Sequence, residues 1–218
     1  MEFYTGILNI NPRLRRTHVP LSIPIVVHTV AGHGKTTLVR QILAQKPDVI
    51  ARTYGRPDPP HLTGVGILGP EGDAHIVDEY PAGDLSKHPS AILILADPLQ
   101  HRRPSRPAHY ISEETARFGT ETCKLLSTLS IHCTSTHSDQ VQEHDIFSFE
   151  PEGVIISLGQ EATDLLRAHK AEFLLPCQTL GETFDTVTLV TDRPLQEQDP
   201  IDAYIAVTRH RKVLHILH

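Results

Sequence analysis

The sequence predicts an α/β protein of two lobes, each built on a mostly parallel sheet, with the second lobe reduced in size. Apolar runs rich in β-branched residues alternate with helix-like segments in both halves of the chain, as in strands joined by crossover helices. Residues 75–80 and 91–97 contain apolar runs that end in acidic side chains, which is how buried parallel strands present functional groups at their carboxyl ends. We expect one lobe over residues 1–130 and the other over 131–218.

Length and composition restrict the class of protein. A chain of 218 residues fits one large domain or two small ones. Three cysteines at wide spacing indicate reduced thiols in a cytosolic setting instead of a disulfide framework. The first 16 residues lack the order of a signal peptide, and no apolar run has the length of a transmembrane helix, so we expect no membrane insertion.

Residues 25–37, IVVHTVAGHGKTT, predict a phosphate-binding loop. A β-branched run leads into a glycine-containing turn, and a helix-like segment follows, which is the strand–loop–helix context that such a loop requires. Backbone N–H groups of the turn and of the helix N-terminus favour an anion there. The residues expected to bind the nucleotide are Gly32, Gly34, Lys35, Thr36 and Thr37.

The expected ligand is ATP with Mg²⁺. Lys35 would reach the β- and γ-phosphates, and the Thr36 hydroxyl would hold the metal ion. One position departs from the usual pattern G-x-x-x-x-G-K-[ST], because Thr29 stands where the first glycine falls. The entrance to the loop must therefore form without a residue that is free to adopt positive φ.

The remaining first-lobe candidates follow two further strands, except Arg117, which lies later in the chain. Asp78 and Glu79 follow an apolar run, and we expect Asp78 to bind Mg²⁺ and Glu79 to orient or activate water. Gln100, shortly after the run 91–97, fits a sensor of the γ-phosphate. Arg117 is a candidate cation for the same phosphate, with a surface helix position as the alternative.

The second half repeats the alternation of strands and helices. We expect strands within 154–159, 184–191, 203–209 and 213–217, and a helix over 161–171. Residues 135–145 are polar and predict a connection. Residues 111–129 predict a helical segment, broken near Gly119, with Ser112 as N-cap. Arg209 would end a strand and stabilise developing charge on the triphosphate, as an arginine finger does.

Charge is distributed unevenly. The formal net charge is −6, yet residues 1–60 carry +5 and residues 131–218 carry −8. A basic N-terminal segment and a basic loop could follow a phosphate backbone, although like charges in blocks often face only water. The candidate RNA-binding residues are Arg13, Arg15, Arg16, Arg102 and Arg103.

Taken in order, AGHGKT, VDEY, ADPLQ, ARFG, QTLGETFDTVTLV and VTRHR resemble the motifs of superfamily-one helicases of positive-strand RNA viruses. More narrowly, the chain resembles the triple gene block protein 1 family, the movement proteins of potexviruses, carlaviruses and their relatives. The resemblance extends from about Pro24 to Leu217. It implies two RecA-like lobes with nucleotide bound between them.

The resemblance also implies a biological role. Family members bind single-stranded viral RNA, hydrolyse ATP and act as RNA helicases. They help viral genomes through plasmodesmata, together with two small membrane-bound movement proteins and often the coat protein. Many suppress host RNA silencing, which implies host partners such as Argonaute. The resemblance further implies a homo-oligomer and a location in the host cytoplasm, with association at plasmodesmata.

Two other interpretations remain open from the sequence. A non-enzymatic protein could keep the helicase fold and sequester RNA or silencing factors, which Thr29 and the small second lobe favour. A P-loop kinase of nucleosides or metabolites would leave Gln100 and the segments around 178–185 and 204–211 without a purpose.

Overall fold

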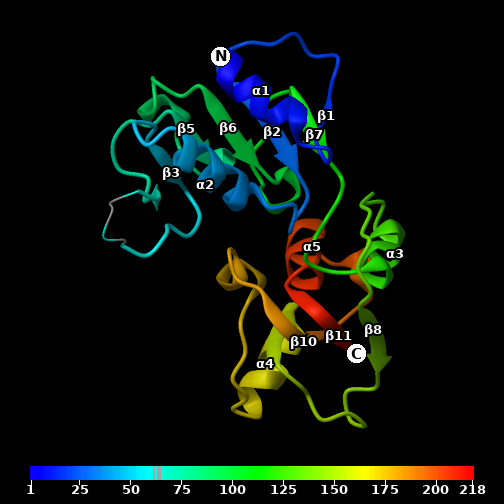
Figure 1. Ribbon diagram of the computed structural model, residues 1–218. Coiled ribbons are helices and arrows are strands. Elements are labelled where there is room, and N and C mark those ends of the chain that lie inside the picture. Colours follow the sequence, from blue (N-terminus) through cyan, green and yellow to red (C-terminus); the bar gives the residue numbers. More distant parts are fainter. Residues whose placement is uncertain (61, 63–64) are drawn as a thin grey trace. The chain divides into compact units, whose positions relative to one another are not determined.

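The computed structural model describes residues 1–60, 62 and 65–218. The chain forms two compact units, Met1–Glu114 and Thr115–His218. Figure 1 shows a twisted sheet with helices in each of them. The α/β class with two mostly parallel sheets is therefore confirmed. Within the part of the chain that the structure describes, there is no helix with the length and apolar character to cross a membrane.

The first unit contains a seven-stranded sheet with the order β1-β7-β2-β6-β5-β3-β4. All of its neighbouring pairs are parallel except the β1–β7 pair. The strands are β1 Arg15–Arg16, β2 Ile25–Thr29, β3 Ala51–Thr53, β4 Ile67–Leu68, β5 Ile76–Asp78, β6 Leu93–Ala96 and β7 Tyr110–Ser112. The helices are α1 Glu2–Ile10 and α2 Lys35–Gln45, with 3₁₀ turns η1 Tyr80–Ala82, η2 Leu85–Lys87 and η3 Pro98–Gln100.

Both faces of this sheet are buried, as the apolar runs predict. On β2, Ile25 and Val27 face one way and pack with Leu8 of α1 and Ile42 of α2. Val26 faces the other way, into a smaller cluster that includes residues of β5 and β6. Burial on both sides explains why these strands are apolar throughout, and it leaves the strand ends to carry polar groups.

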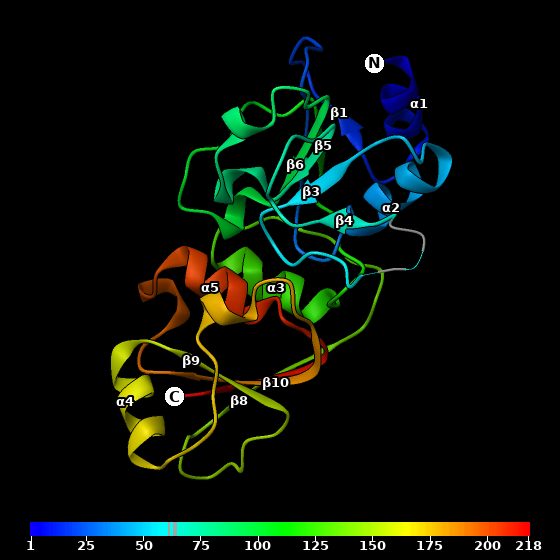
Figure 2. The same ribbon diagram turned by 90° about the vertical axis from the view of Figure 1, so that its left-hand side faces the viewer.

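The second unit contains a four-stranded, fully parallel sheet with the order β8-β11-β10-β9. The strands are β8 Gln140–His144, β9 Val154–Leu158, β10 Phe184–Thr191 and β11 His210–Leu217. The helices are α3 Thr120–Thr128, α4 Gln160–Ala168 and α5 Pro200–Val207, with 3₁₀ turns η4 Pro176–Thr179 and η5 Leu195–Glu197. Figures 1 and 2 show α5 and α4 on opposite sides of this sheet.

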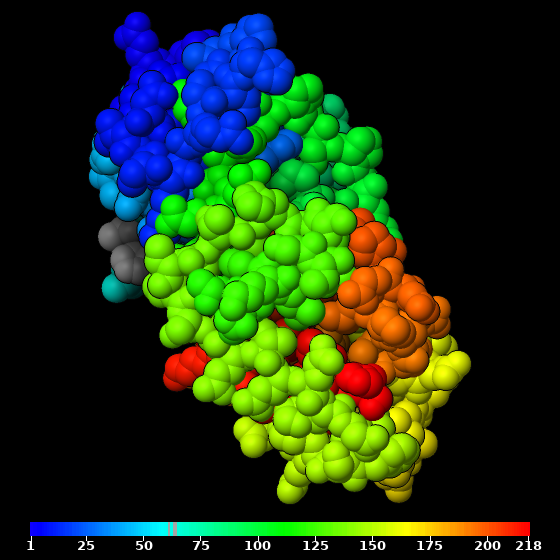
Figure 3. All heavy atoms as spheres, turned by 90° about the vertical axis from the view of Figure 1, so that its right-hand side faces the viewer, coloured from blue at the N-terminus to red at the C-terminus, as the bar shows by residue number. Residues whose placement is uncertain are grey.

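The C-terminal strand β11 is an inner strand of the second sheet. It pairs with β10 on one side and with the edge strand β8 on the other. In Figure 3 the red of β11 shows only in separate patches beside the green to yellow-green chain of α3 and β8. The end of the chain therefore belongs to the core of the second unit.

Residues 203–209 do not form the predicted strand. They belong to helix α5 and the turn that follows it. Asp199 accepts hydrogen bonds from the N–H groups of Ile201 and Asp202, and Pro200 occupies the first helical turn. This capping arrangement starts a helix, and the helix buries its apolar residues on the sheet.

Two other local predictions are also wrong. Ser112 ends strand β7 and does not cap a helix; the helix α3 begins only at Thr120. The polar stretch 135–145 contains the strand β8, which pairs with β11. The chain passes from the first compact unit to the second between Glu114 and Thr115, whereas the expected lobes divide between residues 130 and 131. The reason is that α3 is tied to β8 and β11 by side chains of the second unit, above all Asp139.

Candidate nucleotide site

The predicted phosphate-binding loop has the expected local structure. Strand β2 ends at Thr29, and α2 begins at Lys35 with Gly34 as its N-cap. Gly32 and Gly34 have φ values of 78° and 104°, so both adopt a backbone conformation that side chains disfavour. Among the described residues no side chain caps α2, which leaves the N-terminus of this helix to an anion.

Thr29 adopts strand conformation, and this explains why glycine is not needed there. It is the last residue of β2 and pairs with Ser112 of β7. The positive φ values of the loop fall later, at Gly32 and Gly34. Within the described chain, the buried Thr29 hydroxyl has no hydrogen-bond partner. The departure from the usual pattern therefore does not distort the loop.

Lys35 points to the end of β5. Its Nζ lies 3.3 Å from Oε1 of Glu79, and only 10% of the Lys35 side chain is exposed. Burial alone would lower the pKa of Lys35, but the charges of Glu79, Asp97 and Asp78 raise it above its ordinary value. The lysine is therefore charged and held beside three carboxyl groups, ready to meet a polyanion.

Asp78 ends β5 and is buried. Its Oδ2 accepts a hydrogen bond of 3.3 Å from the Thr53 hydroxyl at the end of β3. Its Oδ1 is buried without a hydrogen-bond partner among the described residues. Burial and the neighbouring charge of Glu79 raise the pKa of Asp78. A buried carboxylate oxygen left without a partner is costly, and it fits a site for a cation.

Oxygen donors suit Mg²⁺ in particular. Thr36 is exposed in the first turn of α2, so its hydroxyl is accessible. Mg²⁺ prefers one or two protein oxygens together with water and substrate phosphates. The pair Asp78 and Thr36 is a donor set of this kind, and the orphaned Oδ1 of Asp78 is the observation that favours it.

Glu79 is held in an unusual conformation. Its φ of 52° and ψ of 40° are left-handed, which is uncommon for a residue other than glycine. Oε2 of Glu79 lies 2.6 Å from Nε2 of His101, while Oε1 faces Lys35. Burial would raise the pKa of Glu79, but Lys35 and His101 lower it, so the side chain is a carboxylate.

Gln100 lies at the same sheet edge. The strand β6 that precedes it pairs with β2 on one side and β5 on the other. Its Nε2 donates a hydrogen bond of 2.7 Å to Oδ2 of Asp97, which is fully buried. The structure therefore brings the carboxyl ends of β2, β5 and β6 together, with the candidates Lys35, Asp78, Glu79 and Gln100.

Two residues at this edge were not among the predicted site residues. Asp97 orients Gln100 and adds negative charge beside Lys35. His101 contacts Glu79 across 22 positions of sequence. The acidic end of the run 91–97 was a signal for Asp97. The sequence placed His101 only in a basic loop after Gln100, because its contact with Glu79 depends on which strands are neighbours.

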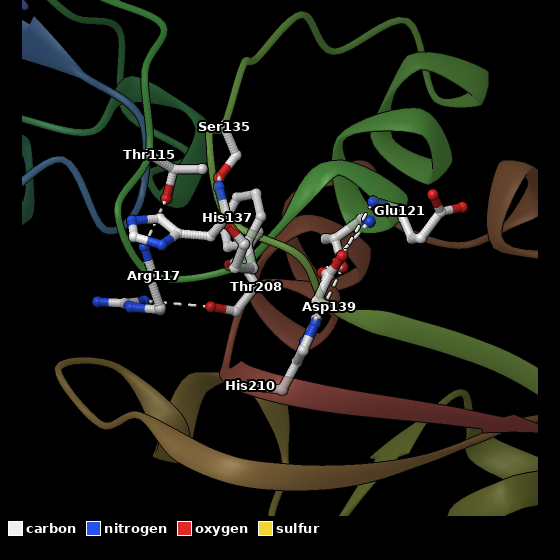
Figure 4. Close-up of polar contacts among 10 residues, drawn as sticks. Thr115, Arg117, Glu121, Ser135, His137, Asp139, Thr208 and His210 are labelled. Atoms are coloured by element: carbon white, nitrogen blue, oxygen red, sulfur yellow. Dashed lines mark hydrogen bonds and ion pairs between the residues drawn. The ribbon is translucent and has the colours of Figure 1, made fainter.

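Arg117 and Arg209 both lie in the second unit, in surroundings that differ from those expected. Arg209 follows helix α5, is 1% exposed, and donates hydrogen bonds to the carbonyls of Ile205 and Thr179. Arg117 lies in the loop before α3, and its Nη1 donates to the carbonyl of Thr208 at 3.2 Å (Figure 4). The strand-end position predicted for Arg209 and the helical position considered for Arg117 are thus wrong, whereas their catalytic roles stay predictions.

Asp139 is a buried carboxylate of the second unit whose hydrogen bonds come from the protein itself. It accepts hydrogen bonds from the backbone N–H groups of Glu121 and Thr122, from the Thr122 hydroxyl and from Nε2 of His210. Figure 4 shows Glu121 of α3 and His210 of β11 on either side of the aspartate. Asp139 therefore joins two elements of the fold and caps the N-terminus of α3.

The arginines predicted to bind RNA differ in exposure and in the contacts that their side chains make with the protein. Arg13 pairs with Glu114 at 3.0 Å. Arg16 donates to the carbonyls of His109 and Thr17 and lies over the Tyr110 ring. Arg15 is exposed. In the second basic segment, Arg102 and Arg103 are exposed, and Arg103 donates to the carbonyl of Gly83.

Comparisons with known proteins agree with this fold. The model of the viral superfamily 1 RNA helicase core domain matches residues 25–218. Arterivirus nonstructural protein 10, a helicase solved in complex with DNA, superposes with a TM-score of 0.56 at 19% identity. The match covers 91% of this chain and 55% of that one, so the chain spans about half the length of the helicase. The chain is therefore a P-loop protein with a viral superfamily 1 helicase core domain over residues 25–218.

Curated relatives are closer in sequence. The movement and silencing protein TGBp1 of Lily virus X is 52% identical, with 100% of both chains covered. TGBp1 of Plantago asiatica mosaic potexvirus is 41% identical over 93% of this chain and 90% of its own. TGBp1 of Apple stem pitting virus is 39% identical over 98% of both. The chain belongs to the TGBp1 family of movement and silencing proteins.

Proposed function

We propose that this chain is an RNA-stimulated nucleoside triphosphatase of the helicase type that works with ATP and Mg²⁺. The observation that carries the proposal is the meeting of Lys35 and Glu79, 3.3 Å apart, beside the orphaned oxygen of Asp78 at one sheet edge. A phosphate-binding lysine, a carboxylate for the metal and a second carboxylate for water are the groups that nucleoside triphosphate hydrolysis uses.

Each group has a part in that chemistry. The open N-terminus of α2 and Lys35 bind the phosphates, with Gly32, Gly34, Thr36 and Thr37 forming the rest of the cradle. Thr36 and Asp78 would hold Mg²⁺, which, when bound, neutralises charge on the β- and γ-phosphates. When phosphate takes the positive charge of Lys35, Oε1 of Glu79 is released from the ion pair and can accept a hydrogen bond from water. Gln100 senses the γ-phosphate.

The biological role rests on the relatives. The proteins of Lily virus X and Plantago asiatica mosaic potexvirus are named for movement and silencing. We propose the same role here: transport of single-stranded viral RNA between cells through plasmodesmata, with the coat protein and two small membrane-bound proteins as partners. Suppression of silencing through host factors such as Argonaute, self-association and a place in the host cytoplasm belong to the same proposal.

A non-enzymatic RNA-binding protein on the same fold is the second candidate. It is favoured by the resting arrangement of Glu79, whose two carboxylate oxygens are both engaged, one by Lys35 and one by His101. In such a protein this cluster would only stabilise the sheet edge. RNA would still bind, but ATP would not be turned over.

RNA-stimulated ATP hydrolysis by the purified protein separates the two candidates. We expect the parent to hydrolyse ATP faster with single-stranded RNA, and Lys35→Ala to lose hydrolysis. Lys87→Ala is the matched control, since Lys87 is an exposed lysine of the same unit in η2. RNA binding without hydrolysis by the parent, or equal hydrolysis by the parent and Lys35→Ala, would contradict the enzymatic proposal.

A further inference from the structure

The segment His101–Arg106, called here the basic loop, is fastened to the residues that follow β5. His101 contacts the Glu79 carboxylate. Nη1 of Arg103 donates to the carbonyl of Gly83 at 2.9 Å, and the N–H of Arg106 donates to the Tyr80 hydroxyl at 2.8 Å. These contacts join one short loop to residues 79–83.

We propose that His101 is a positioning residue that orients the Glu79 carboxylate, and that through it the basic loop makes hydrolysis respond to bound RNA. This inference rests on the proposed function and names the regulation of the same site. It assigns to His101 a part that neither the phosphate-binding loop nor the metal-binding residues supply.

The contact itself is well defined. Nε2 of His101 lies 2.6 Å from Oε2 of Glu79, and the exposed fractions of the two side chains are 10% and 19%. A carboxylate only accepts hydrogen bonds, so Nε2 carries the hydrogen. A short, largely buried hydrogen bond to a charged oxygen is among the stronger contacts available to a side chain.

Glu79 needs the hydrogen bond from His101 because its ion pair with Lys35 would break when nucleotide binds. Lys35, which faces Oε1, is also the residue that would bind the phosphates. The contact with His101 does not depend on Lys35. It can therefore fix the plane of the carboxylate while the lysine binds nucleotide, and the left-handed backbone at Glu79 shows that this orientation is held against a local cost.

The same loop exposes positive charge to RNA. Arg102 follows His101 directly, and both Arg102 and Arg103 are exposed. An RNA phosphate backbone that binds these guanidinium groups would exert a force on the loop that contains His101. The Tyr80 hydroxyl, which accepts from Arg106, also lies 2.9 Å from Nε2 of His28 on β2. The loop is thereby linked to the strand that leads into the phosphate-binding loop.

The test compares His101→Ala and His101→Gln with the parent, and uses His132→Ala, an exposed histidine of the second unit, as the control. Hydrolysis is measured with and without a single-stranded oligouridylate, and binding of Mg·ADP is measured on the same preparations. We expect His101→Ala to lower kcat with RNA by up to about 100-fold, with the affinity for Mg·ADP little changed. His101→Gln should recover part of the rate, because its amide can donate to Glu79.

A second readout does not need hydrolysis. The imidazole signal of His101, identified in isotope-labelled protein by its loss in His101→Gln, should shift when oligouridylate is added. It should shift less in a variant with both Arg102 and Arg103 changed to Ala. Because this signal reports on the ring itself, it separates movement at His101 from a general loss of stability.

The outcomes are distinct. Full RNA-stimulated kcat in His101→Ala, or a loss matched by equally weak Mg·ADP binding, would overturn the positioning role while leaving the proposed function intact. An unmoved imidazole signal would overturn the link to RNA. If the parent hydrolyses no ATP, the proposed function fails, and the shift of the imidazole signal alone decides whether the basic loop acts on His101.

Discussion

Two buried aspartates, one in each unit, show how differently the chain uses the same side chain. Asp139 accepts hydrogen bonds from the backbone of α3, from Thr122 and from His210. Asp78 accepts one from Thr53, and its other oxygen is buried without a partner among the described residues. A carboxylate whose bonds are satisfied by the protein stabilises the fold, whereas one left unsatisfied indicates a ligand site.

The pKa shifts of the two aspartates point in opposite directions. Burial would raise the pKa of Asp139, but the hydrogen bonds from His210, Thr122 and the backbone N–H groups of Gly119 and Glu121 hold it well below its usual range. Burial and the charge of Glu79 raise the pKa of Asp78, and Lys35 only partly offsets them. The sheet edge of the first unit thus carries an electrostatic cost that a bound cation would relieve.

The largest effect is expected at the residue beside Asp78. Glu79→Gln keeps the shape of the side chain but removes the charge that would accept a proton from water or orient it. We expect hydrolysis to fall by about 10²–10⁴-fold, with nucleotide binding retained. Single-turnover hydrolysis and nucleotide affinity, measured on one preparation, check this. Loss of binding together with turnover would show that Glu79 belongs with the metal-binding residues.

The satisfied aspartate should matter for stability instead. Asp139→Ala leaves the N-terminus of α3 uncapped and His210 without its carboxylate, inside a fully buried network. Removing one member of such a network costs about 3–5 kcal/mol. Denaturant unfolding of the second unit measures the loss. A change within the range of ordinary surface substitutions would contradict the structural role given to Asp139.

Low pH should remove the stabilisation that Asp139 gives to the second unit. The pKa of Asp139 is lower in the folded state than the value of about 3.9 expected when the chain is unfolded. The stabilisation is therefore present above about pH 4 and is lost as the pH falls towards the folded pKa. The difference in unfolding free energy between the parent and Asp139→Asn should narrow below about pH 4. A constant difference down to pH 3 would argue against a depressed pKa.

A smaller effect distinguishes the N-terminal arginines. Arg15 is exposed, whereas Arg16 is held by backbone carbonyls and the Tyr110 ring. We expect Arg15→Ala to reduce the salt dependence of single-stranded RNA binding by a slope of up to about 0.7. Arg16→Ala should lower stability with less effect on that slope. Titrations at several salt concentrations, beside thermal unfolding, test this. The reverse result would show that Arg16 leaves its carbonyls to bind RNA.

The place of the candidate residues at the sheet edge of the first unit was predictable because their sequence signals are local. Lys35 and the glycines of its loop lie within one strand–loop–helix segment, and Asp78 directly follows its own apolar strand. The pairing of Lys35 with Glu79 then follows from the parallel neighbours β2, β6 and β5. What the sequence did not show is the contact of His101 with Glu79, because it depends on distant chain segments being adjacent.

The second unit was harder to predict for two physical reasons. The helix α5 is almost wholly apolar and buried, so it has no amphipathic period, and only Asp199-Pro200 at its start indicated a helix. The edge strand β8 is polar and largely exposed, so its pairing with β11 was not visible in its composition. For this reason Arg209 was predicted at the end of a strand, whereas it follows helix α5.

The most direct test of the contrast between the two aspartates is the stabilisation of the first unit by Mg²⁺ and a non-hydrolysable ATP analogue. Unfolding is followed for the parent and for Asp78→Asn without ligand, with the analogue alone, and with the analogue and Mg²⁺ together. We predict that the parent gains about 2.7 kcal/mol at 100 times the dissociation constant, and that Asp78→Asn gains little from Mg²⁺ at the same concentrations. Equal, Mg²⁺-dependent stabilisation of both proteins would contradict the account, since it would show that Asp78 does not hold the metal ion.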